Sequence, residues 1–412
     1  MIINQYRKTL LPSGIKVVSE TIPYVKSFSL GFWFNVGSRD ENLKNNGITH
    51  FIEHMLFKGT KKRSPKKIAE DIEGYGGYLN AFTSKEHTCY YGRGLSQHIG
   101  RTFDVLADMI QEPAFKPSEI KKEAGVIVDE LYDIEDDPED LIFDKFEECL
   151  FGGNSLGMPV IGSEKNIKSF NQSDLFDFIG QKYGFNTLTI AASGAVEHEE
   201  LLRLTEKYIT RDLGKKKIGR KSVKPKVLSE LTVEKDIQQV HAILGTDTYG
   251  YKDKKRAIVN VLSHILGEGS SSRLFQTVRE KNGICYQLNS FLNSFYDVSS
   301  FGVYFSTNDK LFEKSISLIQ KEFKKLRDKK VSDKELKKAK EYLKGSMLLS
   351  LESLTQRMSR MAQSEIYFNR IETVEETIKD IDSVTAEQVL EKANLVLDEK
   401  ALSKVIIRAN NC

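Results

Sequence analysis

Apolar positions along the chain follow two periods, one typical of strands and the other of helices. Apolar residues alternate over 28–36, which predicts a half-buried strand. Similar signals predict further strands at 14–21, 78–84, 87–92 and 187–196. Apolar residues at helical spacing predict helices at 48–56, 99–110 and 117–134. This mixture of strand pairs and long helices favours an α+β fold.

The apolar pattern returns about 210 residues later along the chain. Four parts of the chain take part in this repeat. The predicted helix 258–266 matches 48–56, and the strand pair 288–293 and 299–306 matches the pair near 78–92. The helix 311–326 matches the helix that begins at 99, and 334–338 matches 118–122. A period this long indicates two domains of one fold rather than a solenoid. We therefore predict two homologous domains, each an antiparallel-rich sheet with helices packed on one face.

The predicted domains are 1–213 and 229–412, and the basic, polar stretch 214–228 is interpreted as an exposed linker. A chain of 412 residues is long enough for two cores. Its net charge of +3 gives no argument for binding nucleic acid or a membrane. The four cysteines are scattered, residues 1–7 form no apolar leader, and no run of 18 apolar residues occurs in the sequence. We therefore expect a cytoplasmic protein.

The candidate chemistry begins in the predicted helix between Gly47 and Gly59. His50 and His54 are four residues apart and share one helical face, with Glu53 beside them. Two imidazoles in this spacing supply half of a zinc site, and the neighbouring carboxylate supplies a general base. The order H-x-x-E-H is the inverzincin motif. The alternative is that the two histidines are solvated or packed in a core. A zinc site needs a third protein ligand, which must come from elsewhere in the chain.

Two acidic residues on the helix 117–134 are candidates for completing such a site. Glu123 and Glu130 are seven residues apart on one face, although a carboxylate on a half-buried helix is usually only solvated. The repeat provides an internal control. The second copy has Asn260, Ser263, Ala339 and Ser346 where the first has His50, Glu53, Glu123 and Glu130, and only His54 has a counterpart, His264. Because these candidate residues are missing together from the second copy, we expect only the first half to carry a metal site. His264 is then a core or surface histidine.

These residues resemble the pitrilysin-type inverted-zincin metallopeptidases, and most of all the bacterial homologues of the mitochondrial processing peptidase catalytic subunit. The resemblance extends over nearly the whole chain. It rests on the H-x-x-E-H helix, on a glutamate that follows the motif after 75 intervening residues, and on the segments 76–83, 126–130, 271–275 and 279–286. An arginine and a tyrosine, Arg279 and Tyr286, are separated by six residues in the last of these segments.

The resemblance implies a role for each matching residue: His50, His54 and Glu130 hold one zinc ion, Glu53 is the general base, Glu123 supports a ligand, Arg279 and Tyr286 reach the active site from the second domain, and Asn80 and Ala81 lie on an edge strand that holds the substrate backbone. It further implies a zinc-dependent endopeptidase that hydrolyses extended or unfolded peptides, as processing peptidases do. The expected assembly is a homodimer enclosing a chamber.

The residues alone leave alternatives open. Glu123 can be an ordinary surface acid, Asn80 a turn residue, Tyr286 a core aromatic, and Arg279 a surface cation paired with Glu280. The acidic run 135–140, with Pro138 within it, is either a solvated helix boundary or a docking patch for basic peptides.

The alternative function is a non-catalytic structural or peptide-binding subunit of a related hetero-oligomer, or a plain metal-binding or peptide-binding module. The complete ligand set and base argue against such a subunit, and the glycine-rich loop of the mitochondrial non-catalytic partner is not evident in this sequence.

Overall fold

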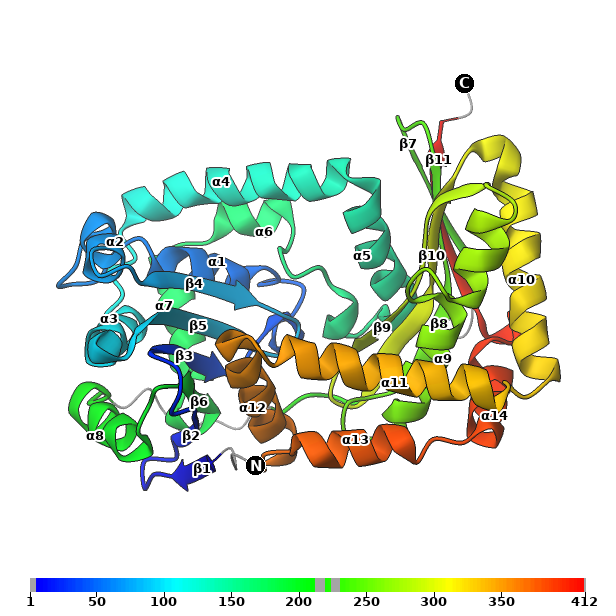
Figure 1. Ribbon diagram of the computed structural model, residues 1–412. Coiled ribbons are helices and arrows are strands. Elements are labelled where there is room, and N and C mark those ends of the chain that lie inside the picture. Colours follow the sequence, from blue (N-terminus) through cyan, green and yellow to red (C-terminus); the bar gives the residue numbers. More distant parts are fainter. Residues whose placement is uncertain (1–4, 212–218, 224–229, 411–412) are drawn as a thin grey trace. The chain divides into compact units, whose positions relative to one another are not determined.

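The computed structural model describes residues 5–211, 219–223 and 230–410, which fall into two compact units (Figure 1). Neither unit is a continuous piece of chain. Unit 1 contains Met1–Tyr132, Pro159–Arg220 and Ser350–Glu372, and unit 2 contains Asp133–Met158, Lys221–Leu349 and Thr373–Cys412.

Unit 1 is built on a six-stranded sheet in the order β1-β2-β6-β3-β5-β4. Its strands are β1 (Gln5–Leu10), β2 (Lys16–Thr21), β3 (Ser27–Phe34), β4 (Tyr78–Thr83), β5 (Thr88–Leu95) and β6 (Leu188–Gly194). Neighbouring strands are antiparallel except for the β2–β6 pair, which is parallel. The order leaves β4 at one edge of the sheet, where no strand of the described residues pairs with one side of its backbone.

Helices cover both faces of this sheet. They are α1 (Ile48–Leu56), α2 (Pro65–Glu73), α3 (Ile99–Gln111), α4 (Pro117–Asp136), α6 (Glu164–Ser169), α7 (Gln172–Lys182), α8 (His198–Tyr208) and α12 (Leu354–Phe368). Phe32 packs edge-on against Phe103 of α3 at 4.9 Å, whereas the next residue, Trp33, packs with Met358 of α12. Since successive strand residues point to opposite faces, β3 is buried on both sides and not half-buried as its alternation predicted.

Unit 2 has a five-stranded sheet in the order β7-β11-β8-β10-β9. Its strands are β7 (Glu230–Lys235), β8 (Val240–Tyr249), β9 (Cys285–Ser294), β10 (Val298–Thr307) and β11 (Ser403–Ala409). Its helices are α5 (Pro138–Phe151), α9 (Arg256–Gly267), α10 (Phe312–Asp328), α11 (Asp333–Ser350), α13 (Val374–Asp382) and α14 (Ala386–Val396), with a π-helical turn η5 (Phe275–Glu280). The main core gathers apolar side chains of α9, α10 and α14 on one sheet face.

The two sheets share one topology, which confirms the predicted fold class. The order β2-β6-β3-β5-β4 in unit 1 corresponds to β7-β11-β8-β10-β9 in unit 2, and the single parallel pair occupies the same place in both. Helices α9, α10 and α11 stand where the repeat places the counterparts of α1, α3 and α4. The pattern of apolar positions therefore identified the repeated elements correctly.

The predicted single face of helices is incomplete, because one helix covers the opposite face of each sheet. In unit 2 this helix is α5, which comes from the first half of the sequence and packs on β8 and β11 through Phe146 and Ile142. In unit 1 it is α12, from the second half, which packs on β2, β3 and β6. The halves thus exchange one helix each, so the compact units do not follow the division 1–213 and 229–412.

The proposed linker 214–228 lies partly outside the described residues, which exclude 212–218 and 224–229. Within its described part, Arg220 is not an exposed connector residue. Its guanidinium donates to Asp40 Oδ2 at 2.8 Å and to Asn35 Oδ1 at 3.0 Å, and its side chain is only 14% exposed. This part of the stretch is bound to unit 1 by a buried ion pair.

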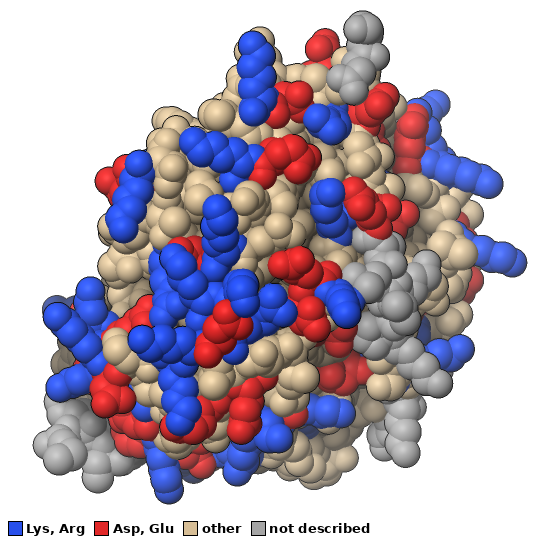
Figure 2. Space-filling model, turned by 90° about the vertical axis from the view of Figure 1, so that its right-hand side faces the viewer, with Lys and Arg blue, Asp and Glu red and all other residues tan. Residues whose placement is uncertain are grey.

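Charged side chains on α10 are paired with one another. Lys324 contacts Asp328 and Lys325 contacts Glu322, each at 2.6 Å. Figure 2 shows the face on which α10 lies, with lysine and arginine side chains intermixed with aspartate and glutamate. Such mixing agrees with the small net charge. Among the described residues, no helix is both long and apolar enough to cross a membrane.

Candidate metal centre

Helix α1 carries the two histidines and begins at an unusual N-terminus. Gly47, the residue before it, has a left-handed backbone with φ of 98°. The buried carboxylate of Glu41 takes the place of a capping side chain: Oε1 accepts from the N–H of Thr49 and Oε2 from the N–H of Gly47, both at 2.8 Å. Asn46 donates to Oε2 at 3.0 Å. These contacts fix the start of the helix.

The two histidines converge with Glu130 of α4. His50 Nε2 lies 3.8 Å from Glu130 Oε1, and His54 Nε2 lies 3.5 Å from Glu130 Oε2. One ligand atom from each residue can be chosen so that all three lie within 4.8 Å of one another, and no other such cluster of three occurs among the described residues. In Figure 1 α4 passes above α1, and their side chains bring together two residues that are 76 positions apart in the sequence, His54 and Glu130.

This arrangement fits a zinc ion. Zinc binds histidine nitrogen and carboxylate oxygen at about 2.1 Å, so two ligands of a tetrahedral site are about 3.4 Å apart. The separations of 3.5 and 3.8 Å are close to that value. His50 Nδ1 is buried without a hydrogen-bond partner among the described residues, so no contact through Nδ1 fixes the tautomer of His50. The donor set is the two-histidine, one-glutamate set of a catalytic zinc site, which leaves a position for water.

Glu123 supports the second histidine and is not a surface acid. It is 2% exposed, and its Oε1 lies 2.9 Å from His54 Nδ1, while Lys58 donates to its Oε2 at 2.7 Å. A hydrogen bond from Nδ1 leaves the lone pair of Nε2 free for a metal. Burial opposes ionisation of Glu123, but the contacts with His54 and Lys58 outweigh it and lower its pKa. The sequence analysis did not single out Lys58.

The pKa shifts of His50 and Glu53 suit metal binding and base catalysis, whereas the pKa of His54 is raised because its contacts with Glu123 and Glu130 outweigh burial. Burial, helped by the charge of His54, lowers the pKa of His50 to about 4, so its ring is neutral at pH 7. Burial also raises the pKa of Glu53, although the hydrogen bond that Thr83 Oγ1 donates to Glu53 Oε2 at 2.5 Å acts in the opposite direction. A raised pKa makes a carboxylate a better proton acceptor.

Thr83 links the metal centre to the edge strand. It is the last residue of β4, and its contact with Glu53 places this end of the strand beside the candidate base. Asn80 lies within β4 and is therefore not a turn residue. Its Oδ1 accepts from the N–H of Ala81 at 2.9 Å, and its Nδ2 donates to the Tyr78 hydroxyl at 2.8 Å. The predicted edge strand is thus present, while binding of substrate by Asn80 and Ala81 stays a prediction.

Arg279 and Tyr286 belong to unit 2 and lie near each other. The Arg279 guanidinium is 4.8 Å from the ring centre of Phe275 and 5.9 Å from that of Tyr286. Tyr286 is 76% exposed, so it is not a core aromatic, and Arg279 forms no ion pair with Glu280 or another described residue. The core position of Tyr286 and the pairing of Arg279 with Glu280 are therefore wrong, whereas Arg279 is an exposed cation, as that alternative had it. The predicted role of this pair at the metal centre stays a prediction.

The second copy of the helix lacks this chemistry, as the repeat predicted. In α9, Ser263 donates to Glu268, and the buried His264 stacks on Tyr342 at 4.1 Å. His264 is thus a core histidine.

The acidic run 135–140 is a helix boundary. Asp137 caps α5 by accepting from the N–H of Glu139 at 2.8 Å, and Pro138 is the first residue of that helix. Docking of basic peptides to this run stays a prediction.

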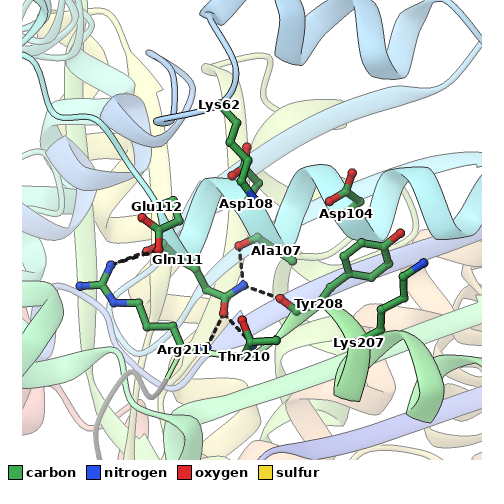
Figure 3. A pocket seen from close by; sticks show the side chains of 10 residues that line it. All are labelled: Lys62, Asp104, Ala107, Asp108, Gln111, Glu112, Lys207, Tyr208, Thr210 and Arg211. Carbon is green, nitrogen blue, oxygen red and sulfur yellow. Dashed lines mark hydrogen bonds and ion pairs between the residues drawn. The ribbon is translucent and has the colours of Figure 1, made fainter.

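A small pocket of about 170 Å³ lies between α3 and α8 and is lined by residues outside the metal centre (Figure 3). At its centre, Gln111 donates to the carbonyl oxygens of Ala107 and Tyr208 and accepts from the N–H groups of Thr210 and Arg211. These bonds tie the end of α8 to α3. None of the predicted site residues lines this pocket, so we interpret it as a structural junction.

Comparison with family models divides the chain in two. A model described as insulinase (peptidase family M16) matches residues 16–164, and a model described as peptidase M16 inactive domain matches residues 169–343. The first match contains all of the converging residues, and the second begins after them. This division agrees with the absence of the ligands from the second copy.

Relatives match along almost the whole chain. An uncharacterised zinc protease of Streptomyces coelicolor is 35% identical, covering 98% of this chain and 90% of its own length. One from Bacillus subtilis is 36% identical, covering 92% of each chain. The crystal structure of a protease from Helicobacter pylori has a TM-score of 0.91 at 21% identity, covering 98% of this chain and 99% of that one, which shows a shared fold.

Proposed function

The chain belongs to peptidase family M16, and we propose that it is a zinc-dependent endopeptidase that cleaves extended or unfolded peptides. The observation that carries the proposal is the meeting of His50, His54 and Glu130 within 4.8 Å, with Glu53 on the same helix. The relatives are named zinc proteases, which supports zinc as the metal.

Each residue of the centre has a distinct task. His50, His54 and Glu130 would hold zinc, which supplies Lewis acidity and lowers the pKa of a water bound to it. Glu53 accepts the proton of the attacking water and later donates it to the leaving amine. Glu123 and Lys58 hold the His54 ring in the orientation that the metal requires.

The edge strand supports the choice of an extended substrate. An unpaired strand edge can bind a peptide backbone through main-chain hydrogen bonds without reading its sequence. Strand β4 offers such an edge, and its last residue contacts the candidate base. Arg279 and Tyr286 are proposed to complete the site by stabilising the developing oxyanion and positioning the substrate carbonyl. The proposed assembly is a homodimer, which light scattering of the purified protein tests.

The deciding experiment compares wild type with Glu53→Gln on a mixture of unstructured peptides. We expect cleavage by wild type, a loss of at least a hundredfold in rate for the variant, and zinc retained in both, because Glu53 is not a ligand. His50→Gln should lose both zinc and activity. His98→Gln is the matched control, since His98 lies in unit 1 and contacts Tyr75 rather than the centre.

A different outcome would identify the alternative. If wild type binds peptides and zinc but releases no more product than Glu53→Gln, the chain is a non-catalytic binding subunit. If neither protein retains zinc after dialysis, the metal centre itself is refuted.

A further inference from the structure

A second pocket of unit 1 lies at the opposite end of β4 from the metal centre. It has a volume of about 470 Å³ and is open to solvent. Its walls come from the first residues of β3 and β4, the last residues of β5 and the N-terminus of α12. The residues that give it chemical character are Phe28, Tyr78, Arg93, Leu95 and Leu354. None of them has a role in the metal centre.

The pocket joins an apolar lining to one uncompensated positive charge. Tyr78 and Leu95 are 42% and 48% exposed, which is unusual for large apolar side chains that meet in a hollow. The Arg93 guanidinium stacks on the Tyr78 ring at 4.4 Å and forms no ion pair with any described residue. Since Arg93 pairs with Tyr78 across the two strands, this stacking carries its charge from β5 toward the edge strand.

A peptide added beside β4 would reach from one site to the other. Thr83 contacts Glu53 at the metal end, and Tyr78 lines the pocket at the far end, five residues along the strand. At about 3.3 Å per residue the span is about 17 Å, or five residues of an extended substrate. An antiparallel peptide runs from Thr83 toward Tyr78, which puts the pocket on the carboxyl-terminal side of the cleaved bond.

We propose that this pocket is a distal substrate subsite that binds a carboxylate about five residues to the carboxyl side of the cleaved bond, with Arg93 as its specificity-determining residue. The carboxylate comes from an aspartate or glutamate side chain or from the peptide's own C-terminus. A guanidinium fixed on an aromatic ring presents its N–H groups to a planar carboxylate, and the apolar wall holds the aliphatic part of the side chain. The inference rests on the proposed peptidase function.

The test uses an unstructured peptide whose cleavage site has first been mapped. Glutamate replaces glutamine singly at the third to seventh positions on each side of that site, and shortened peptides end at the fifth position as free acid or amide. We expect KM to fall about tenfold for a carboxylate near the fifth carboxyl-side position, with kcat unchanged, because the contact is remote from the reacting atoms. The two series distinguish a side-chain carboxylate from a terminal one.

Variants assign the effect to the pocket. Arg93→Gln should abolish the preference, whereas Arg203→Gln, which removes an exposed arginine of α8 outside the pocket, should keep it. Arg93→Glu should favour lysine over glutamate at the same position, a reversal that mere loss of stability does not produce. A preference that survives Arg93→Gln, a preference on the amino side, or none in wild type overturns the subsite.

Binding separates this proposal from the peptidase proposal. The affinity of the Glu53→Gln protein for glutamate and glutamine peptides is measured by fluorescence anisotropy, so cleavage is not needed. Carboxylate-dependent binding that Arg93→Gln abolishes, without cleavage by wild type, supports a carboxylate-binding pocket at Arg93 and refutes both the peptidase and the position given relative to a cleaved bond. Cleavage and binding that are both indifferent to the carboxylate refute the subsite alone.

Discussion

The chemistry of the candidate centre depends on which nitrogen of His54 is free. Glu123 is buried against Nδ1 of that ring and receives a second contact from Lys58, so the carboxylate is held on both oxygens. A histidine oriented in this way binds a metal through Nε2 without first rotating or changing tautomer. Glu123 would thus act on the metal through the side chain of His54.

Replacing Glu123 by Gln should therefore weaken zinc binding by about 10-fold to 100-fold, because the neutral amide orients the ring less firmly and makes it less basic. Competition with a chromophoric chelator measures the affinity. Glu119→Gln, on the same helix and without an ion pair to any described residue, is the control and should bind zinc as wild type does. Equal affinities in all three proteins would show that Glu123 has only a packing role.

At the scale of the element, helix α1 depends on one buried carboxylate. Glu41 accepts hydrogen bonds from two backbone N–H groups at the N-terminus of the helix, which has no capping side chain of its own. Burial raises the pKa of Glu41 to about 7, although its hydrogen bonds with Thr49, Gly47 and Asn46 act in the opposite direction.

The sign of the pH effect follows from this shift. The unfolded chain releases the Glu41 proton near pH 4.5, whereas the folded protein keeps it to about pH 7. The stability due to this shift is complete below the unfolded pKa and is lost as the pH rises through 7. Urea unfolding with chelator present should therefore show that Glu41→Gln costs more free energy of unfolding at pH 5 than at pH 8. A difference that grows with pH contradicts the assignment.

The turn before α1 requires glycine. Gly47 has φ of 98°, and a Cβ built on it would lie 2.6 Å from the carbonyl oxygen of Ile161. Gly47→Ala should cost about 2 kcal/mol in the free energy of unfolding and reduce zinc affinity by shifting the helix. Gly180→Ala is the contrasting control, because Gly180 is exposed in α7 with open space around it. That variant should be neutral or more stable by up to about 1 kcal/mol.

At the scale of the whole molecule, zinc should stabilise unit 1 selectively, since its ligands join α1 to α4 and the described residues of unit 2 contain no such cluster. Binding at a thousand times Kd adds about 4 kcal/mol to the stability of the folded state. Removing zinc should therefore speed amide hydrogen exchange in α1 and α4. Exchange in α9, the counterpart of α1 without ligands, is the internal control and should not change. Equal acceleration in α9 would mean that the two units unfold together.

The exchange of helices α5 and α12 was beyond the reach of sequence reasoning. The strands and helices of each half were predictable because apolar period is a local property. The face on which a helix packs is not local, since α12 lies more than 300 residues from β3 in sequence and yet buries Trp33. For the same reason the alternation around β3 predicted a half-buried strand, although α12 covers its second face.

The sequence by itself determined the repeated elements, the H-x-x-E-H face of α1 and the absence of its ligands from the second copy, because these follow from spacing along one helix or between two copies. The tertiary structure decided that Glu130 meets both imidazoles and that Glu123 is buried against His54. It also brought Glu41, Lys58 and Thr83 to the centre, which no local pattern marked. Contacts between residues far apart in sequence depend on how the helices and the sheet pack, and that packing places the base, the ligands and their supports around one point.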